Sequence, residues 1–230
     1  MAHVDRSVHI PAAARYLTNP DRSEDLTIFL LACRRAYNDF VLYHNFRHVI
    51  DVLQAIFYFL LRIGLLPPYQ AQAGTTLHPN NAVAAVLKPF DALTLLVAAI
   101  GHDVGHPGVN NAFLVALNAP LAQLYNDRSV LEAFHCAAYS QILRRYWPAA
   151  FSDMNMRKLM ITSILATDMG LHFKYIMDMG NLQEKLAASQ ATASGWSSKA
   201  GDENRDLVCG LLIKCADISN VVRRARMHSS

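Results

Sequence analysis

The sequence predicts an all-α protein, folded as a compact bundle of irregularly packed helices. Apolar residues recur at three- and four-residue steps in most segments, which is the period of a helix. No long run alternates apolar and polar residues, as a strand with one solvated face would. The 230 residues are 53% apolar and 17% charged, which is enough for a sizeable core and fits a single domain, residues 1–230.

The first half of the chain contains three expected helices. Residues 25–40 begin with acidic side chains, which favour a helix start, and continue with helical apolar spacing. A second helix is expected over residues 44–63 and ends at Gly64. Residues 64–81 are rich in Pro, Gly, Asn and Thr and predict a loop. Residues 91–100 are apolar nearly all round, which predicts a buried helix and leaves a buried strand as the alternative.

The second half is expected to contribute three more helices. They cover residues 129–146, 155–166 and 206–220, and the last again has the character of a buried helix. Residues 181–204 are small, polar and poor in apolar side chains, so we expect a flexible insertion with Trp196 as a possible anchor.

Charge and cysteine content limit the function classes. The formal net charge of +3 does not call for a nucleic acid or an anionic membrane as partner. The four cysteines include no C-x-x-C pair, so we expect reduced thiols in the core. The longest uncharged apolar stretch, Ala92 to Gly101, is ten residues long and too short to span a bilayer, and no secretory signal opens the chain. We therefore expect an intracellular, cytoplasmic protein.

Histidines and acidic residues gather in four short motifs. In YHNFRHVIDV, His44 and His48 are four residues apart, so on one helix they would share a face. In IGHDVGHPGVNN, His102, Asp103 and His106 place three potential metal ligands within five residues. The alternative for this second motif is a polar cap that holds the end of the preceding helix.

The other two motifs carry single carboxylates in apolar surroundings. In ILATDMGLH, Asp168 and His172 end an apolar helix, where a histidine placed against the helix dipole is the alternative interpretation. In LLIKCADISN, an unpaired Asp217 would be costly to bury, which favours a metal or histidine partner. Two imidazoles and two carboxylates suit Zn²⁺, Mg²⁺ or Mn²⁺ in a catalytic site that keeps room for water. The proposed ligand set is His48, His102, Asp103 and Asp217.

The order of these motifs resembles a known family. The strings YHN-x-x-H-x-x-DV, HD-x-x-HPG-x-x-N, ILATDM-x-x-H and ADISN, together with YNDRSVLEAFH, are similar to class I cyclic-nucleotide phosphodiesterases of the HD-domain superfamily. The resemblance covers residues 36–220. It implies a helical phosphodiesterase catalytic domain that hydrolyses cyclic AMP or cyclic GMP to the 5′-monophosphate. Such a domain would act in cyclic-nucleotide signalling.

The resemblance also assigns roles to residues. His48, His102, Asp103 and Asp217 would bind the first of two divalent ions, Zn²⁺ and Mg²⁺ or Mn²⁺. Asp103 would also reach the second ion, and His44 would be the general acid that protonates the leaving oxygen. The residues expected to orient waters, ligands and motif loops are His106, Asn111, Glu132, His135, Asp168, His172 and Asn220.

Three departures from the family pattern follow. Gly105 stands where many relatives carry a second acid, and Ala133-Phe134 replaces a common Asn-His pair. After ADISN the chain reads VVRRARMHSS, so we expect a partial domain that lacks the family's last helices and its base-binding wall. The alternatives are a catalytically impaired or inactive metal-binding fragment, or another HD-type nucleotide phosphohydrolase. The sequence does not choose between cyclic AMP and cyclic GMP.

Overall fold

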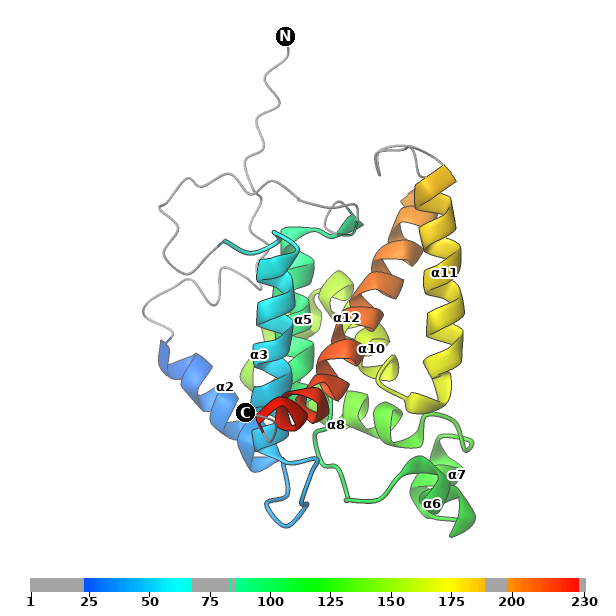
Figure 1. The fold of residues 1–230 in the computed structure, drawn as a ribbon. Helices are drawn as coiled ribbons and strands as arrows, with labels where there is room; N and C mark the ends of the chain where they lie inside the picture. Colours follow the sequence, from blue (N-terminus) through cyan, green and yellow to red (C-terminus); the bar gives the residue numbers. More distant parts are fainter. Residues whose placement is uncertain (1–22, 68–82, 84–85, 189–197, 228–230) are drawn as a thin grey trace.

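A computed structural model describes residues 23–67, 83, 86–188 and 198–227. The regular elements in this part of the chain are all helical, which confirms the predicted fold class (Figure 1). They are α2 (Ser23–Arg35), α3 (Phe46–Arg62), α5 (Pro89–Gly101), α6 (Asn111–Ala116), α7 (Pro120–Leu124), α8 (Val130–Tyr146), α9 (Pro148–Ser152), α10 (Met154–Leu165), the 3₁₀ helix η2 (Met169–Leu171), α11 (His172–Ala188) and α12 (Ser198–Met227). No helix in these ranges is both long enough and apolar enough to cross a membrane.

Helix α5 contacts α3, α8, α10 and α12, and it carries a candidate site motif at its carboxyl end. The helix starts with Pro89 at its first turn, and the carboxylate of Asp91 accepts a backbone N–H at 2.7 Å. Gly101, the last residue of the helix, has no room for a side chain because the ring of Tyr139 lies where a Cβ atom would stand. The expected buried helix is confirmed here, and the strand alternative is wrong.

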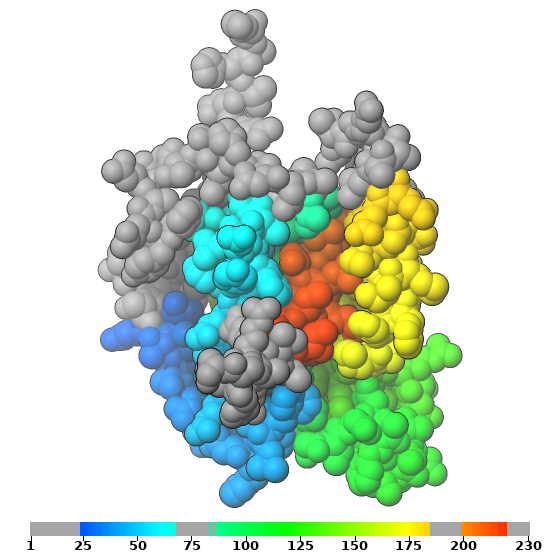
Figure 2. Space-filling view, in the orientation of Figure 1, coloured from blue at the N-terminus to red at the C-terminus, as the bar shows by residue number. Residues whose placement is uncertain are grey.

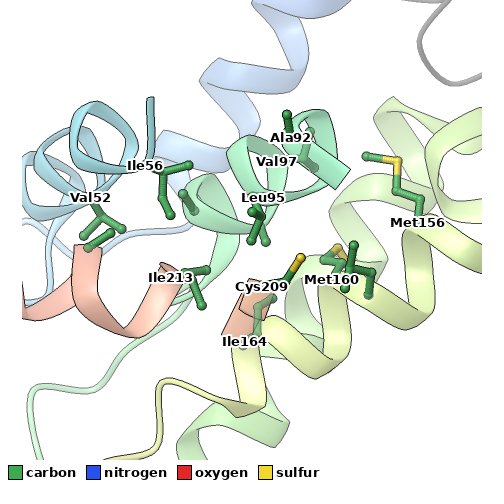
Figure 3. Packing of buried hydrophobic residues seen from close by; sticks show 14 of the residues in the cluster. Val52, Ile56, Ala92, Leu95, Val97, Met156, Met160, Ile164, Cys209 and Ile213 are labelled. Carbon is green, nitrogen blue, oxygen red and sulfur yellow. The ribbon is translucent and has the colours of Figure 1, made fainter. Parts of the chain in front are cut away.

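Helix α12 lies between α3 and α11 and also packs on α5 and α10 (Figures 1 and 2). The core between these helices is filled by side chains from each of them (Figure 3). Ile56 of α3, Leu95 of α5, Ile164 of α10 and Ile213 of α12 are fully buried. The core therefore forms only when segments far apart in the sequence meet, and this packing brings α12 beside α3.

Helix α2 is shorter than predicted. It ends at Arg35 instead of Phe40, and the next carbonyl, that of Ala36, accepts a hydrogen bond from the backbone N–H of Gly105 at 3.0 Å. The chain leaves the helix at this point because its backbone pairs with the turn after α5.

Helix α3 begins later than predicted. Asn45 is its N-cap, and the Asn45 side chain accepts a hydrogen bond from the backbone N–H of Arg47 at 3.0 Å. His44 therefore precedes the helix, while His48 lies in its first turn. The prediction that both histidines share one helix face is wrong, because the cap turns the chain just after His44.

Two parts of the insertion expected over residues 181–204 are helical in the structure. Residues 181–188 belong to α11, where Leu182 is buried in the core, and residues 198–204 belong to α12. Residues 189–197, with Trp196, lie outside the described residues, as do residues 68–81 of the expected loop.

The cysteines follow the prediction with one exception. Cys33, Cys136 and Cys209 are free and buried. Cys215 is free but exposed, because it falls on the solvent side of α12.

Truncation of Leu95 should destabilise the fold strongly. Leu95 is fully buried on α5, so Leu95→Ala leaves a cavity and should lower the free energy of unfolding by about 2–5 kcal/mol. Leu124 is 68% exposed, and Leu124→Ala should change the free energy of unfolding by less than about 0.5 kcal/mol. Urea unfolding followed by circular dichroism measures both values, and equal losses would contradict the described core.

Candidate active site

His102 and Asp103 directly follow α5, where hydrogen bonds fix their directions. His102 is fully buried, and its Nδ1 lies 2.9 Å from the carbonyl oxygen of Ala99. A carbonyl can only accept, so Nδ1 carries a proton and Nε2 is the nitrogen that faces the interior. The backbone N–H of Asp103 donates to the Tyr37 hydroxyl at 3.3 Å, and that hydroxyl donates to the carbonyl of Ile100 at 2.8 Å.

Four side-chain atoms from three segments meet beside His102. They are Nε2 of His48 on α3, Nε2 of His102, Oδ2 of Asp103, and Oδ1 of Asp217 on α12. The His48 nitrogen lies 2.9 Å from the Asp217 oxygen, 3.3 Å from the His102 nitrogen and 3.5 Å from the Asp103 oxygen. The His102 nitrogen lies 3.3 Å from the Asp103 oxygen and 3.6 Å from the Asp217 oxygen. All four residues selected from the sequence as ligands are thus brought together.

These separations fit the donor set of one metal ion. Four ligands held about 2.0–2.1 Å from a tetrahedral zinc lie about 3.3–3.4 Å from one another. The five separations that involve a histidine nitrogen, 2.9–3.6 Å, bracket that value, and imidazole nitrogens with carboxylate oxygens are suitable donors. The cluster could therefore hold a metal ion. A second group of possible ligands, His44, Asp103 and His106, shares Asp103 with it.

The charges in this cluster favour a cation at its centre. Burial lowers the pKa of His102, but the carboxylates of Asp103 and Asp217 outweigh burial and raise that pKa well above 6.5. Burial raises the pKa of Asp217, but hydrogen bonds with His102 and His48 bring it down to about 2. Two ionised carboxylates at this depth need a positive charge near them, which a proton or a metal ion can supply.

His44 approaches the cluster from the turn before α3. Its Nδ1 lies 2.9 Å from Oδ2 of Asp103, and its side chain is 36% exposed. Its ring stacks on His106 at 4.0 Å with 14° between planes, and His106 stacks on His135 at 5.5 Å with 21°. Burial lowers the pKa of His106 to about 4 and also lowers that of His135. His44 is therefore the accessible end of a column whose other two members are neutral at neutral pH.

The two carboxylates of the cluster and the three stacked histidines line a cavity of about 660 Å³. The acidic residues on its walls are Asp103, Glu132, Asp168 and Asp217. No lysine or arginine belongs to its lining among the residues that the structure describes. An anionic ligand would be repelled from such a cavity unless bound cations offset the carboxylates.

Several of the predicted supporting residues are held by hydrogen bonds at this cavity. Asn111 donates to Glu132 at 2.9 Å and accepts a backbone N–H from the start of α8 at 2.8 Å. Nδ1 of His135 lies 2.8 Å from the carbonyl oxygen of Val104, which leaves Nε2 3.7 Å from Oδ1 of Asp103. These contacts tie α8 to the turn that carries Asp103.

The third and fourth motifs are only partly at the cavity. Asp168 lines it, but His172 is not among the lining residues. His172 begins α11, and its Nδ1 is buried with no hydrogen-bond partner among the described residues. A histidine at the start of a helix cannot offset the negative end of the dipole, so the C-terminal dipole interpretation is wrong. The side chain of Asn220 lies outside the described residues.

The structure adds two residues that the sequence analysis missed. Lys214 is buried on α12 and donates to the carbonyls of Ala166 and Asp168 at 3.0 and 2.8 Å. Ser129 donates to Oδ2 of Asp168 at 2.7 Å. A lysine inside the apolar run LLIKCAD was a usable signal, because a buried ammonium requires acceptors. Ser129 gave no comparable signal.

The sequence profile of a known family matches residues 43–230 of this chain, and that family is described as 3′5′-cyclic nucleotide phosphodiesterase. The chain belongs to this family. It is 34% identical over 199 residues to 3′,5′-cyclic-nucleotide phosphodiesterase 2 of Saccharomyces cerevisiae, and the match covers 86% of this chain and 30% of the yeast protein. It is 31% identical over 204 residues to 3′,5′-cyclic-AMP phosphodiesterase 4C of Mus musculus, and the match covers 86% of this chain and 27% of the mouse protein.

Solved structures of phosphodiesterases share the fold. The crystal structure of yeast caPDE2 superposes with a TM-score of 0.70 at 39% identity, covering 86% of this chain and 40% of that one. The structure of LmjPDEB1 in complex with IBMX gives a TM-score of 0.64 at 32% identity, and the match covers 86% of this chain and 53% of that one. The chain thus spans less than a third of the curated relatives named above.

Two departures from the family pattern meet in space. Gly105 has a φ of +76°, a left-handed conformation that side chains rarely adopt. A Cβ atom at this position would lie 2.9 Å from Cε1 of Phe134. The Phe134 ring therefore occupies the room that a side chain at position 105 would need.

Substitution at these two positions should be non-additive. Gly105→Asp should lower the melting temperature because the new side chain meets the Phe134 ring in a strained backbone conformation. Adding Phe134→His removes the larger ring, so the double variant should recover about 1 kcal/mol relative to the sum of the single changes. Gly180→Asp, whose Cβ meets nothing within 4 Å, is the control for the added charge. Strict additivity in thermal unfolding would contradict the coupling.

Proposed function

We propose that this chain hydrolyses 3′,5′-cyclic nucleotides to 5′-monophosphates with the help of divalent metal ions. The observation that carries the proposal is the meeting of four suitable donor atoms beside the 660 Å³ cavity, which Asp103 and Asp217 line together with the accessible His44. Membership of the phosphodiesterase family supports the reaction type. The chain covers only part of its relatives, so the activity and the substrate are inferred here for the domain it contains.

Metal ions are required by the charge of the cavity. His48, His102, Asp103 and Asp217 would hold the first ion, for which Zn²⁺ is the best fit to nitrogen and oxygen donors. Asp103 would also face a second ion, Mg²⁺ or Mn²⁺, whose waters would be oriented by Glu132 and its neighbours. Such ions would supply charge neutralisation of the phosphodiester and activation of water.

His44 is suited to protonate the leaving 3′ oxygen. Its Nδ1 is engaged with Asp103, which leaves Nε2 as the nitrogen that can face a substrate in the cavity. Stacking on the neutral His106 fixes the plane of the ring without adding a competing charge.

The free thiols support an intracellular location for this activity. Cys33, Cys136, Cys209 and Cys215 are unpaired, as in proteins of reducing compartments. The substrate we infer is a cyclic nucleotide, and the described residues do not select its base.

The direct test is hydrolysis of cyclic AMP and cyclic GMP, measured separately with the purified chain. Zn²⁺, Mg²⁺ or Mn²⁺ is added in turn, and a chelator serves as the control. We expect metal-dependent release of the 5′-monophosphate. A folded, metal-loaded chain that turns over neither nucleotide would refute the proposed activity and leave a metal-binding protein.

Two variants should separate metal binding from proton donation. His44→Ala removes only the proton donor, so kcat should fall about 10²–10⁴-fold while the metal content stays unchanged. Asp103→Ala removes a ligand at the centre of the cluster and should abolish both activity and metal content. Metal is measured by mass spectrometry after dialysis. Unchanged metal in Asp103→Ala would show that the ligand assignment is wrong.

Metal uptake should release a proton and strengthen as the pH rises. In the metal-free chain the pKa of His102 is raised, so an entering ion must displace its proton, whereas Asp217 is already ionised. The same shift stabilises the metal-free fold below the ordinary pKa of His102, and this contribution fades as the pH rises through the raised pKa. Zn²⁺ affinity should therefore increase by up to about 10-fold per pH unit near neutrality. Competition titrations with a chromophoric chelator measure it, and a pH-independent affinity would contradict the protonated His102.

A further inference from the structure

Lys214 is a buried cation that the residues assigned so far do not explain. It lies on α12, three residues before Asp217, and is 3% exposed. Residues three apart share a helix face, so Lys214 is on the side of α12 that also carries Asp217. A buried ammonium is costly unless its hydrogens are bonded, and Nζ meets this need at two carbonyls, those of Ala166 and Asp168.

These carbonyls belong to the turn between α10 and η2. Ala166 is the C-cap of α10, where helical carbonyls lack partners within the helix and the dipole is negative. Lys214 therefore caps α10 from a neighbouring helix and fixes the path of the chain at Asp168, which lies on the cavity wall. A lysine whose role was general stability would not need to contact this particular turn.

Three donors from three segments hold Asp168. Ser129 donates to Oδ2 at 2.7 Å, the backbone N–H of Gly170 donates to Oδ1 at 2.7 Å, and Lys214 holds the backbone carbonyl at 2.8 Å. Ser129 itself has a φ of +41°, a left-handed conformation that is uncommon for serine. The backbone of Ser129, just before α8, thus has an unfavourable conformation at the point where the Ser129 hydroxyl reaches Asp168.

We propose that Lys214 and Ser129 are positioning residues that hold the Asp168 carboxylate on the cavity wall, where it accepts hydrogen bonds from the waters of the second divalent ion. This inference rests on the proposed function, because it assigns to that site the residues that orient one of its supporting carboxylates. Residues that orient the surroundings of an ion typically change its affinity 10- to 100-fold. Both residues act through Asp168, so their effects must depend on its carboxylate.

The test measures Mn²⁺ binding by electron paramagnetic resonance to the full chain already loaded with one equivalent of Zn²⁺. Lys214→Met keeps the length of the side chain and removes its charge, and Ser129→Ala removes one hydroxyl. Each should weaken Mn²⁺ binding about 10-fold or more and leave the Zn²⁺ content unchanged. Lys174→Met is the matched control, because Lys174 is exposed and its ion pair is with Asp178 in its own helix. It should leave Mn²⁺ affinity unchanged.

The decisive comparison repeats the substitutions in an Asp168→Asn chain. If Lys214 and Ser129 act through the carboxylate, neither change should weaken Mn²⁺ binding further there. An equal loss in both backgrounds, unchanged affinity in the single variants, or a wild-type chain that holds no Mn²⁺ beyond the Zn²⁺ would each overturn the proposal. Should Lys214→Met fail the circular dichroism check of folding, Ser129→Ala decides the question alone. Since no substrate is present, a chain that binds Mn²⁺ as expected but hydrolyses nothing would contradict the proposed function and leave this inference standing.

Discussion

The structure depends on burying two carboxylates and two imidazoles where α3, the turn after α5 and α12 meet. Removing these groups from water is costly, and the cost is offset only if each group finds a partner of opposite charge or a shared cation. The histidine nitrogens of His48 and His102 lie 2.9–3.6 Å from the oxygens of Asp103 and Asp217, which gives each group such a partner. The surrounding elements supply the required precision: Asn45 caps the start of α3, Gly101 lets the Tyr139 ring pack against the end of α5, and the apolar core holds α12 beside both helices.

The two walls of the cavity are fixed by different means. The wall that carries the donor atoms is continuous with the apolar core, so the directions of His48 and His102 follow from helix packing. Another part of the lining is the turn between α10 and η2, which is held by hydrogen bonds from Ser129 and Lys214. Between them, the stacked histidines have opposing environments: burial keeps His106 neutral, while His44 stays open to the cavity beside a carboxylate. His44 is therefore the ring that can donate a proton, and His106 is the ring that holds His44 in place.

Much of this arrangement could be predicted from the sequence. The period of apolar residues located α5, α8 and α10, and the His-Asp motifs selected all four donor residues because such groups are rarely placed in apolar runs without a purpose. The position of His44 was not predictable from spacing, because the Asn45 cap decides where α3 begins. The helices at residues 181–188 and 198–204 were missed because their polar composition hides the neighbouring anchors. The contact between Gly105 and Phe134 joins distant positions through tertiary structure, which local patterns do not encode.

The central claim is that one ion sits among His48, His102, Asp103 and Asp217. An anomalous difference map, collected at the zinc absorption edge from a crystal of the Zn²⁺-loaded chain, tests it most directly. The geometry predicts a peak about 2.0–2.2 Å from Nε2 of both histidines and from one oxygen of each carboxylate. A zinc peak instead between His44, Asp103 and His106, the second group of possible ligands, would contradict the claim and would remove His44 as the proton donor.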